Sequence, residues 1–346
     1  MTKIILDDFG IFLGRKRNRF IIRKGEEKRE FQAETVDSII CTTIGASITS
    51  SALRLAAEKK IQITFAYHSG DPYAILMPTT LTGSVRARRE QFKAYTDKRS
   101  LTLAKAFIKG KLKNQANILK LMAKNRKPRN RRLAAELYKA GRTIDRINQT
   151  IDQIEGRNID EKRQTLMNIE AEAARTYWRA ISLTLPTELK FTGRKTRGAK
   201  DPFNAMLNFG YQAALFPEVW RAICYAGLDP YAGFLHADRP GKPSLVLDLM
   251  EEFRQQTIDR TLISLISRKI IKPDEILATE TEAEERTLTK KTVQKIFEEF
   301  MNRLETKVMF NNRKGTIKSF IHQQARNITR YLLKDTKTYT PFTLGW

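Results

Sequence analysis

Two kinds of hydrophobic pattern divide the chain. Over roughly the first eighty residues, short runs of strand type are broken by charged or glycine-containing turns. These runs span residues 3–6, 10–13, 20–23, 29–32, 38–42, 61–65 and 73–77. One short helix lies among them at residues 52–58, with Ser50 or Ser51 as its N-cap. The pattern predicts a small, mostly β domain of short local hairpins that ends near residues 81–84.

From residue 85 onward the periodicity is helical almost throughout. Segments rich in Ala, Leu and Lys span residues 85–123, 131–154, 160–183, 203–226, 244–266, 290–305 and 317–333. Glycine and proline gather between them at residues 192–202, 227–243 and 310–315. The predicted fold class is therefore α+β. A mostly β domain over residues 1–83 is followed by a larger all-α helical domain over residues 84–346.

One of these helices carries a glutamate inside its apolar face. Glu170 shares a row with Met167 and Ala174, whereas Glu172 lies on the opposite side, in line with two arginines. A carboxylate within an apolar face is costly unless it is paired, coordinated or protonated. The helix therefore presents one buried glutamate, which either binds a metal or pairs with a buried arginine as an ordinary core residue.

A Pro/Gly loop places His236, one of three histidines, just ahead of the helix predicted to begin at Ser244 as N-cap. On that helix Asp248 lies one turn before both Glu251 and Glu252, so the three carboxylates are expected to point to broadly the same side. Like charges this close need a cation among them, either an arginine or a divalent metal. A histidine beside acids suits a metal with mixed nitrogen and oxygen ligands. The alternative is a solvated acidic face beside a structural histidine.

Composition indicates a polyanionic partner. The chain has 63 Lys and Arg against 38 Asp and Glu, a formal net charge of +25 and a pI near 10.1. The excess gathers in two runs, at residues 124–132 and 193–200. No basic amphipathic helix with a broad apolar face accompanies them, which disfavours a membrane surface. The residues expected to contact nucleic-acid phosphates are Lys124, Arg126, Lys127, Arg129, Arg131, Arg132, Arg194, Lys195 and Arg197.

The chain shows no sign of export. Acidic residues stand where a signal peptide would have its apolar stretch, and no apolar run reaches the length of a membrane span. The two cysteines, Cys41 and Cys224, lie in apolar surroundings and form no CxxC pair, which excludes a zinc ribbon. These features predict a soluble cytoplasmic protein in a reducing compartment.

Four motifs occur in a specific order. They are NIEAEAARTYW at residues 168–178, DPFNAMLNFGY at 201–211, AGLDPYAGFLH at 226–236 and SLVLDLMEEFR at 244–254. Together they resemble the CRISPR adaptation integrases, the Cas-one family of spacer acquisition, over nearly the whole chain. The family usually has glycine after the first glutamate, where this chain has Ala171.

The resemblance implies a metal-dependent DNA endonuclease that installs spacers in a CRISPR array. It identifies Glu170, His236 and Glu251 as catalytic metal ligands for Mg²⁺ or Mn²⁺. Asp248 matches a further acidic position, which either helps to hold a second ion or orients His236. Asn204 and Tyr211 match supporting positions. The expected partners are spacer-precursor and repeat DNA, a second copy bound through the β domain, and a small second adaptation subunit.

Two alternatives remain open from the residues alone. A non-catalytic, basic helical scaffold for nucleic acid would bind DNA with the same salt sensitivity but would not need His236 or Glu170. A ribonuclease is the other, because the metal chemistry hardly distinguishes the two sugars.

Overall fold

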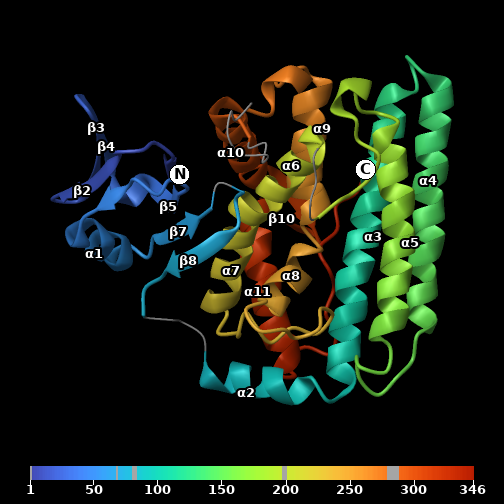
Figure 1. Cartoon of the computed structure of the whole chain (residues 1–346). Coiled ribbons are helices and arrows are strands. Elements are labelled where there is room, and N and C mark those ends of the chain that lie inside the picture. The colour runs from blue at the N-terminus through green and yellow to red at the C-terminus, as the bar shows by residue number, and fades with distance from the viewer. Residues whose placement is uncertain (1, 68, 80–83, 197–200, 279–287) are drawn as a thin grey trace. The chain divides into compact units, whose positions relative to one another are not determined.

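The computed structural model describes residues 2–67, 69–79, 84–196, 201–278 and 288–346 (Figure 1). The chain divides into two compact units, Met1–Leu81 and Thr82–Trp346. The first unit is rich in strands and the second in helices, so the predicted α+β class is confirmed. Most of the predicted boundary, at residues 81–83, lies outside the described residues. None of the described helices is long and apolar enough to cross a membrane.

The N-terminal unit contains two four-stranded sheets. In one sheet the order is β1 (Thr2–Leu6), β5 (Val36–Cys41), β7 (Gln62–Ala66) and β8 (Pro72–Leu76). Its first three strands pair in parallel, and only β7 and β8 are antiparallel. The prediction of short local hairpins is wrong for this sheet. Parallel neighbours need long crossovers, and here the crossovers contain the second sheet and a helix.

The second sheet does follow the predicted hairpins. Its order is β4 (Glu27–Gln32), β3 (Arg19–Lys24), β2 (Phe12–Lys16) and β6 (Ser47–Ile48), with antiparallel pairing between β4 and β3 and between β3 and β2. The short strand β6, which the sequence did not predict, pairs in parallel with β2. The turn η1 (Ala33–Thr35) leads into β5.

Helix α1 (Ser50–Glu58) packs against both sheets. Its N-cap is Thr49, whose hydroxyl accepts a hydrogen bond from the Ala52 amide, so the prediction of Ser50 or Ser51 as cap is wrong. Apolar residues of α1 and of both sheets form one buried core, which includes Leu6, Leu13, Phe20, Ile39, Leu55 and Ile63.

The helical unit begins with α2 (Val85–Ala94), α3 (Lys98–Arg126), α4 (Arg131–Thr150), η2 (Ile151–Gln153) and α5 (Arg163–Ser182). Helices α3, α4 and α5 pack side by side (Figure 1). The sequence predicted one continuous helix over residues 85–123. The structure instead breaks it at residues 95–97, because the Asp97 carboxylate accepts a hydrogen bond from the Arg99 amide and so caps α3.

Two further predicted helices are interrupted by π-helical turns. Residues 203–226 form α6 (Pro202–Phe209), the π turn η4 (Gly210–Leu215) and α7 (Phe216–Tyr225). Residues 244–266 form α8 (Ser244–Met250), the π turn η5 (Gln255–Asp259) and α9 (Arg260–Ser267). A Cβ on Gly210 would lie 2.7 Å from Ile258 Cγ2, so glycine allows η4 to approach η5. Such π turns occur often at functional sites.

The chain then continues through η6 (Pro273–Glu275), α10 (Lys290–Leu304) and α11 (Ile317–Leu332). A turn, η3 (Thr187–Leu189), precedes α6. Between α10 and α11 the strands β9 (Lys307–Phe310) and β10 (Arg313–Thr316) form an antiparallel hairpin. The prediction of an all-α second domain therefore missed one small β element.

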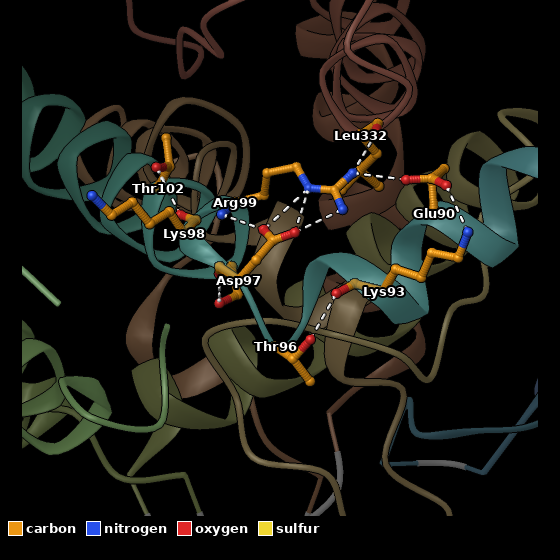
Figure 2. Close-up of polar contacts among 9 residues, drawn as sticks. Glu90, Lys93, Thr96, Asp97, Lys98, Arg99, Thr102 and Leu332 are labelled. Atoms are coloured by element: carbon orange, nitrogen blue, oxygen red, sulfur yellow. Dashed lines mark hydrogen bonds and ion pairs between the residues drawn. The ribbon is translucent and has the colours of Figure 1, made fainter. Parts of the chain in front are cut away.

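Arg99 joins three helices at the start of α3 (Figure 2). Its guanidinium donates to both carboxylate oxygens of Asp97, to Glu90 Oε2 of α2 at 3.0 Å and to the Leu332 carbonyl at the end of α11 at 2.7 Å. Only 13% of the Arg99 side chain is exposed. These hydrogen bonds fix the start of α3 relative to α2 and α11.

We expect Arg99→Met to lower the free energy of unfolding by about 1.5–3 kcal/mol, because it leaves the Leu332 carbonyl and the Asp97 carboxylate without their charged donor and Glu90 with Lys93 alone. Urea unfolding followed by circular dichroism measures this. Lys98→Met is the matched control, because Lys98 is exposed and its side chain lies outside this network. Equal stabilities for the two variants would contradict the assigned role.

Candidate metal centre

Asp248 holds His236 in one orientation. The Asp248 side chain is fully buried in α8, and its carboxylate accepts hydrogen bonds from the backbone amides of Phe234, Leu235 and His236 at 2.6–2.9 Å. The same carboxylate lies 2.7 Å from His236 Nδ1. With Nδ1 held in this way, Nε2 is the ring nitrogen left to bind a ligand.

The loop that carries His236 is fastened from two other helices. Arg163, in the first turn of α5, donates to the carbonyls of Phe234 and Leu235 at 3.1 and 3.0 Å. Gln91 of α2 donates to the carbonyls of Asp229 and Ala232. The hydrogen bonds from Arg163 attach the histidine loop to the first turn of α5, the helix that bears Glu170.

Ser244 has a different role from the one predicted. It is the first residue of α8 rather than its N-cap, and its hydroxyl accepts from the Gly233 amide and donates to the Tyr231 carbonyl. A Cβ on Gly233 would lie 2.7 Å from the Ser244 backbone, so glycine is required for this close approach. The serine therefore ties the loop to the helix.

Glu170 and Glu251 meet at a single cation, the ammonium of Lys111. Lys111 Nζ lies 2.5 Å from Glu170 Oε1 and 2.6 Å from Glu251 Oε2. The three side chains, from α3, α5 and the turn after α8, are 13%, 18% and 7% exposed respectively. Glu172, by contrast, is exposed, so the predicted difference between the two glutamates of α5 is confirmed.

Glu251 is surrounded by positive charge. Arg254 Nε lies 3.2 Å from Glu251 Oε1, opposite the Lys111 contact. Burial alone would raise the pKa of Glu251, but the charges of Arg254, Lys111 and His236 outweigh it and lower the pKa to about 2. The carboxylate is therefore ionised at neutral pH and available as a ligand.

Glu252 belongs to a different environment. It is fully buried and accepts hydrogen bonds from the Tyr339 hydroxyl, the Gln324 amide and the Phe342 backbone amide at 2.6–2.8 Å. Burial raises the pKa of Glu252 to about 7, although the three hydrogen bonds from neutral donors act in the opposite direction. The prediction that Asp248, Glu251 and Glu252 point to the same side is therefore wrong, since each has its own set of partners.

The C-terminal segment also reaches α3 beside this point. Asn114, one turn after Lys111, donates to the carbonyls of Glu252 and Phe342 and accepts from the Leu344 amide. Residues 339–344 therefore connect the lysine-bearing helix with the turn that carries Glu251.

Asn204 and Tyr211, predicted as supporting residues, contact neighbouring arginines. The Asn204 side chain is buried and holds the 193–195 loop by accepting from Arg194 and Lys195. The Tyr211 ring lies between the guanidinium groups of Arg194 and Arg254, at 5.3 and 4.5 Å from their central carbons. Both residues therefore act through arginines and have no direct contact with the candidate ligands among the described interactions.

Asp259 closes this supporting network. Its fully buried carboxylate accepts hydrogen bonds from the hydroxyls of Tyr177 and Tyr211. Burial raises the pKa of Asp259 to about 6, even though both tyrosines stabilise its charged form. The π turn η5 ends at this residue.

The residue types at this centre fit a divalent ion. Glu251 Oε2 is buried, and its partner among the described residues is the ammonium of Lys111 at 2.6 Å. Two carboxylates and an imidazole suit Mn²⁺ and accommodate Mg²⁺. In this conformation, no three His, Cys, Asp or Glu side chains within the described ranges are gathered closely enough to hold a metal ion. The ammonium lies where the two carboxylates converge.

The predicted phosphate-binding residues fall into two groups. Lys124, Lys127, Arg129, Arg131 and Arg132 are exposed at the turn between α3 and α4, and Arg126 is half-buried there. This turn lies about 20 Å along α3 from Lys111. Lys195 is exposed, whereas Arg194 is turned inward onto Asn204 and Tyr211. Arg197 lies outside the described residues.

The sequence prediction missed Lys111, Arg163 and Arg254. The burial of Lys111 could have been predicted from the sequence. On α3 it lies on the same face as Phe107 and Ile108, one turn before it, and Gln115, one turn after it. A lysine at such a position needs a partner, by the same reasoning that identified Glu170. Arg163 and Arg254 carried no comparable signal in the sequence.

The chain matches one protein family over most of its length. The family model described as CRISPR associated protein Cas1 matches residues 4–302. The CRISPR-associated endonuclease Cas1 1 of Archaeoglobus fulgidus is 37% identical over 352 residues, which cover 99% of this chain and 100% of that protein.

Two solved structures share the fold. A casposase bound to an integration product superposes with a TM-score of 0.82 at 24% identity, covering 98% of this chain and 93% of that one. A Cas6-RT-Cas1–Cas2 complex contains a chain that superposes with a TM-score of 0.78 at 18% identity, covering 99% of this chain and 36% of that one.

The pKa of Glu252 gives a testable dependence of stability on pH. The folded protein keeps a proton on Glu252 up to about pH 7, whereas the unfolded chain releases it near 4.5. The stabilising contribution of this proton is therefore complete below pH 4.5 and is lost as the pH rises through 7. Relative to the wild type, Glu252→Gln should gain about 2–3 kcal/mol of unfolding free energy between pH 5 and pH 8.

Urea unfolding at both pH values measures this difference. The exposed Glu172→Gln is the control and should keep a constant difference from the wild type. If the difference in unfolding free energy between Glu252→Gln and the wild type is the same at pH 5 and pH 8, the raised pKa of Glu252 is contradicted.

Proposed function

The chain belongs to the Cas1 family of CRISPR-associated proteins, and on that basis we propose that it is a divalent-metal-dependent DNA endonuclease and integrase that inserts spacer DNA into a CRISPR array. One observation carries the proposal. Two carboxylates from separate elements, Glu170 and Glu251, converge on a single cation near an imidazole that Asp248 orients.

The proposed reaction is a phosphodiester exchange. The oxygen of a 3′-hydroxyl, or of water in simple cleavage, forms a bond to a phosphorus atom of the target strand. The bond from that phosphorus to its leaving oxygen breaks, and the proton of the nucleophile is released as the leaving oxygen gains one. With a 3′-hydroxyl nucleophile, the number of phosphodiester bonds is unchanged and no cofactor is consumed.

Glu170, His236 and Glu251 would hold the ion, and Mg²⁺ or Mn²⁺ suits this donor set. A divalent ion there would lower the pKa of the hydroxyl nucleophile and offset the charge on the phosphate. Asp248 Oδ1 keeps His236 Nδ1 occupied and its ring fixed, and Oδ2 accepts from the amides of Phe234 and Leu235, so both oxygens are engaged. This favours Asp248 as the residue that orients the histidine over Asp248 as a ligand of a second ion.

The proposed partners are DNA and a small second subunit. The casposase neighbour is bound to an integration product, and another neighbour is part of a complex with Cas2. The exposed cations at the α3–α4 turn and the net charge of +25 support a polyanionic partner.

Association of two copies through the N-terminal unit belongs to the same proposal. Several large apolar side chains of this unit are exposed, and exposed apolar groups favour association. They are Phe9, Ile44, Tyr67 and Tyr73, at 80%, 91%, 61% and 53% exposure.

Substitution of the ligands should separate catalysis from binding. We expect Glu170→Gln and Glu251→Gln to abolish cleavage and joining of a branched DNA substrate in Mn²⁺, while DNA binding is largely retained. An amide keeps the shape of the side chain but loses the charge that a hard cation requires. The measurement is strand cleavage and joining, with DNA affinity and thermal melts recorded for each variant.

Glu172→Gln and Glu252→Gln are the matched controls and should keep most of the activity, since neither carboxylate faces the centre. Near-normal rates for Glu170→Gln and Glu251→Gln would show that these carboxylates are not the catalytic ligands, whereas absence of strand cleavage and joining in the wild type would favour a non-catalytic scaffold. Undiminished activity in excess chelator would exclude the metal mechanism.

DNA affinity should depend on the exposed turn between α3 and α4. Neutralising Lys124, Arg126, Lys127, Arg129, Arg131 and Arg132 together should reduce the slope of log K against log[salt] by about 0.9 for each DNA phosphate that these side chains neutralise in the wild type. The control variant neutralises Lys16, Arg19 and Arg29, which already pair with carboxylates of the N-terminal unit. An unchanged slope in the six-site variant would place the DNA elsewhere.

A further inference from the structure

Lys111 lies at the point where the candidate ligands converge. Its ammonium is within 2.6 Å of one oxygen from each of Glu170 and Glu251, and only 13% of its side chain is exposed. It lies in the middle of α3, and the residues one turn before and after it on the same face of the helix are buried. Glu170 and Glu251 are therefore the anionic partners of this ammonium among the described contacts.

The charges around Lys111 are balanced as they stand. Glu170 and Glu251 contribute two negative charges, and Lys111 and Arg254 contribute two positive ones. A divalent ion would add two positive charges to a group that is already neutral, and at short range these would repel the ammonium.

We propose that Lys111 is an internal counter-cation of this centre, which holds Glu170 and Glu251 together before a divalent ion binds and which opposes the binding of that ion. This inference rests on the proposed function. Lys111 is a positioning residue here, because it acts on the two carboxylates. The same two contacts that stabilise the metal-free protein thereby weaken its affinity for the metal.

Removal of the ammonium should therefore have opposite effects on two measured quantities. Without Lys111, Glu170 has no counter-charge among its described contacts and Glu251 keeps only Arg254. Breaking a buried ion pair on one side destabilises the folded protein. A divalent ion relieves that destabilisation, so the same change favours metal binding.

The test is a titration of the full-length protein with Mn²⁺ alone, followed by isothermal calorimetry. Lys111→Met should bind Mn²⁺ about tenfold more tightly than the wild type, or better. Lys109→Met is the matched control, because Lys109 is on the same helix but pairs with Asp152 away from the centre. It should bind Mn²⁺ as the wild type does. Glu251→Gln identifies the site, since it should abolish binding.

A second measurement uses melting temperatures in the absence of metal. Lys111→Met should melt lower than the wild type, and the double variant with Glu170→Gln should recover part of the loss, because one unpaired charge is then removed. If Lys111→Met does not fold, Lys111→Gln serves in both measurements, since its amide still donates to one carboxylate while the charge is gone.

The outcomes separate this inference from the proposed function. Wild-type binding that Glu251→Gln abolishes, with equal or weaker affinity in Lys111→Met, would overturn the role of Lys111 and leave the metal centre intact. Absence of Mn²⁺ binding in both the wild type and Lys111→Met, with folding preserved, would overturn the metal centre and this inference with it.

Discussion

A buried carboxylate must have a partner, and this requirement organises the helical unit of the chain. Four acids within twelve residues, Asp248, Glu251, Glu252 and Asp259, are all buried. Each meets the requirement differently. Asp248 accepts from backbone amides and an imidazole, Glu251 is paired with cations, Glu252 is surrounded by neutral donors, and Asp259 accepts from two tyrosines. The raised pKa values of Glu252 and Asp259, and the lowered pKa of Glu251, follow from these differences.

The same requirement brings distant segments of the chain together. Glu251 draws in Lys111 from α3, and through Lys111 it is linked to Glu170 of α5. Two turns earlier on α5, Arg163 fixes the loop of His236. Lys111 and Glu170 therefore come from long helices, which hold side chains more rigidly than loops do. Glu251 lies in the turn after α8, and the loop of His236 is held by hydrogen bonds from Arg163 and to Asp248.

Sequence reasoning succeeded where a single element decides the outcome. The register of α5 separates Glu170 from Glu172, and the two hydrophobic periodicities divide the strand-rich unit from the helical one. It failed where a second element decides. The parallel pairing of β1, β5 and β7, the π turns, and the separate environments of Glu251 and Glu252 all depend on distant partners. Lys111 is an intermediate case, because its row on α3 signals burial but not the identity of its partners.

The contacts of residues 339–344 have a consequence for the order in which the protein is made. These residues hydrogen-bond to Glu252, next to Glu251, and to Asn114, one turn from Lys111. Because the ribosome synthesises the chain from its N-terminus, α3, α5 and the turn with Glu251 and Glu252 all emerge before residues 339–344 do. The centre consequently completes its support only after synthesis has passed residue 344. A growing chain that has not reached residue 344 lacks these hydrogen bonds to Glu252 and Asn114.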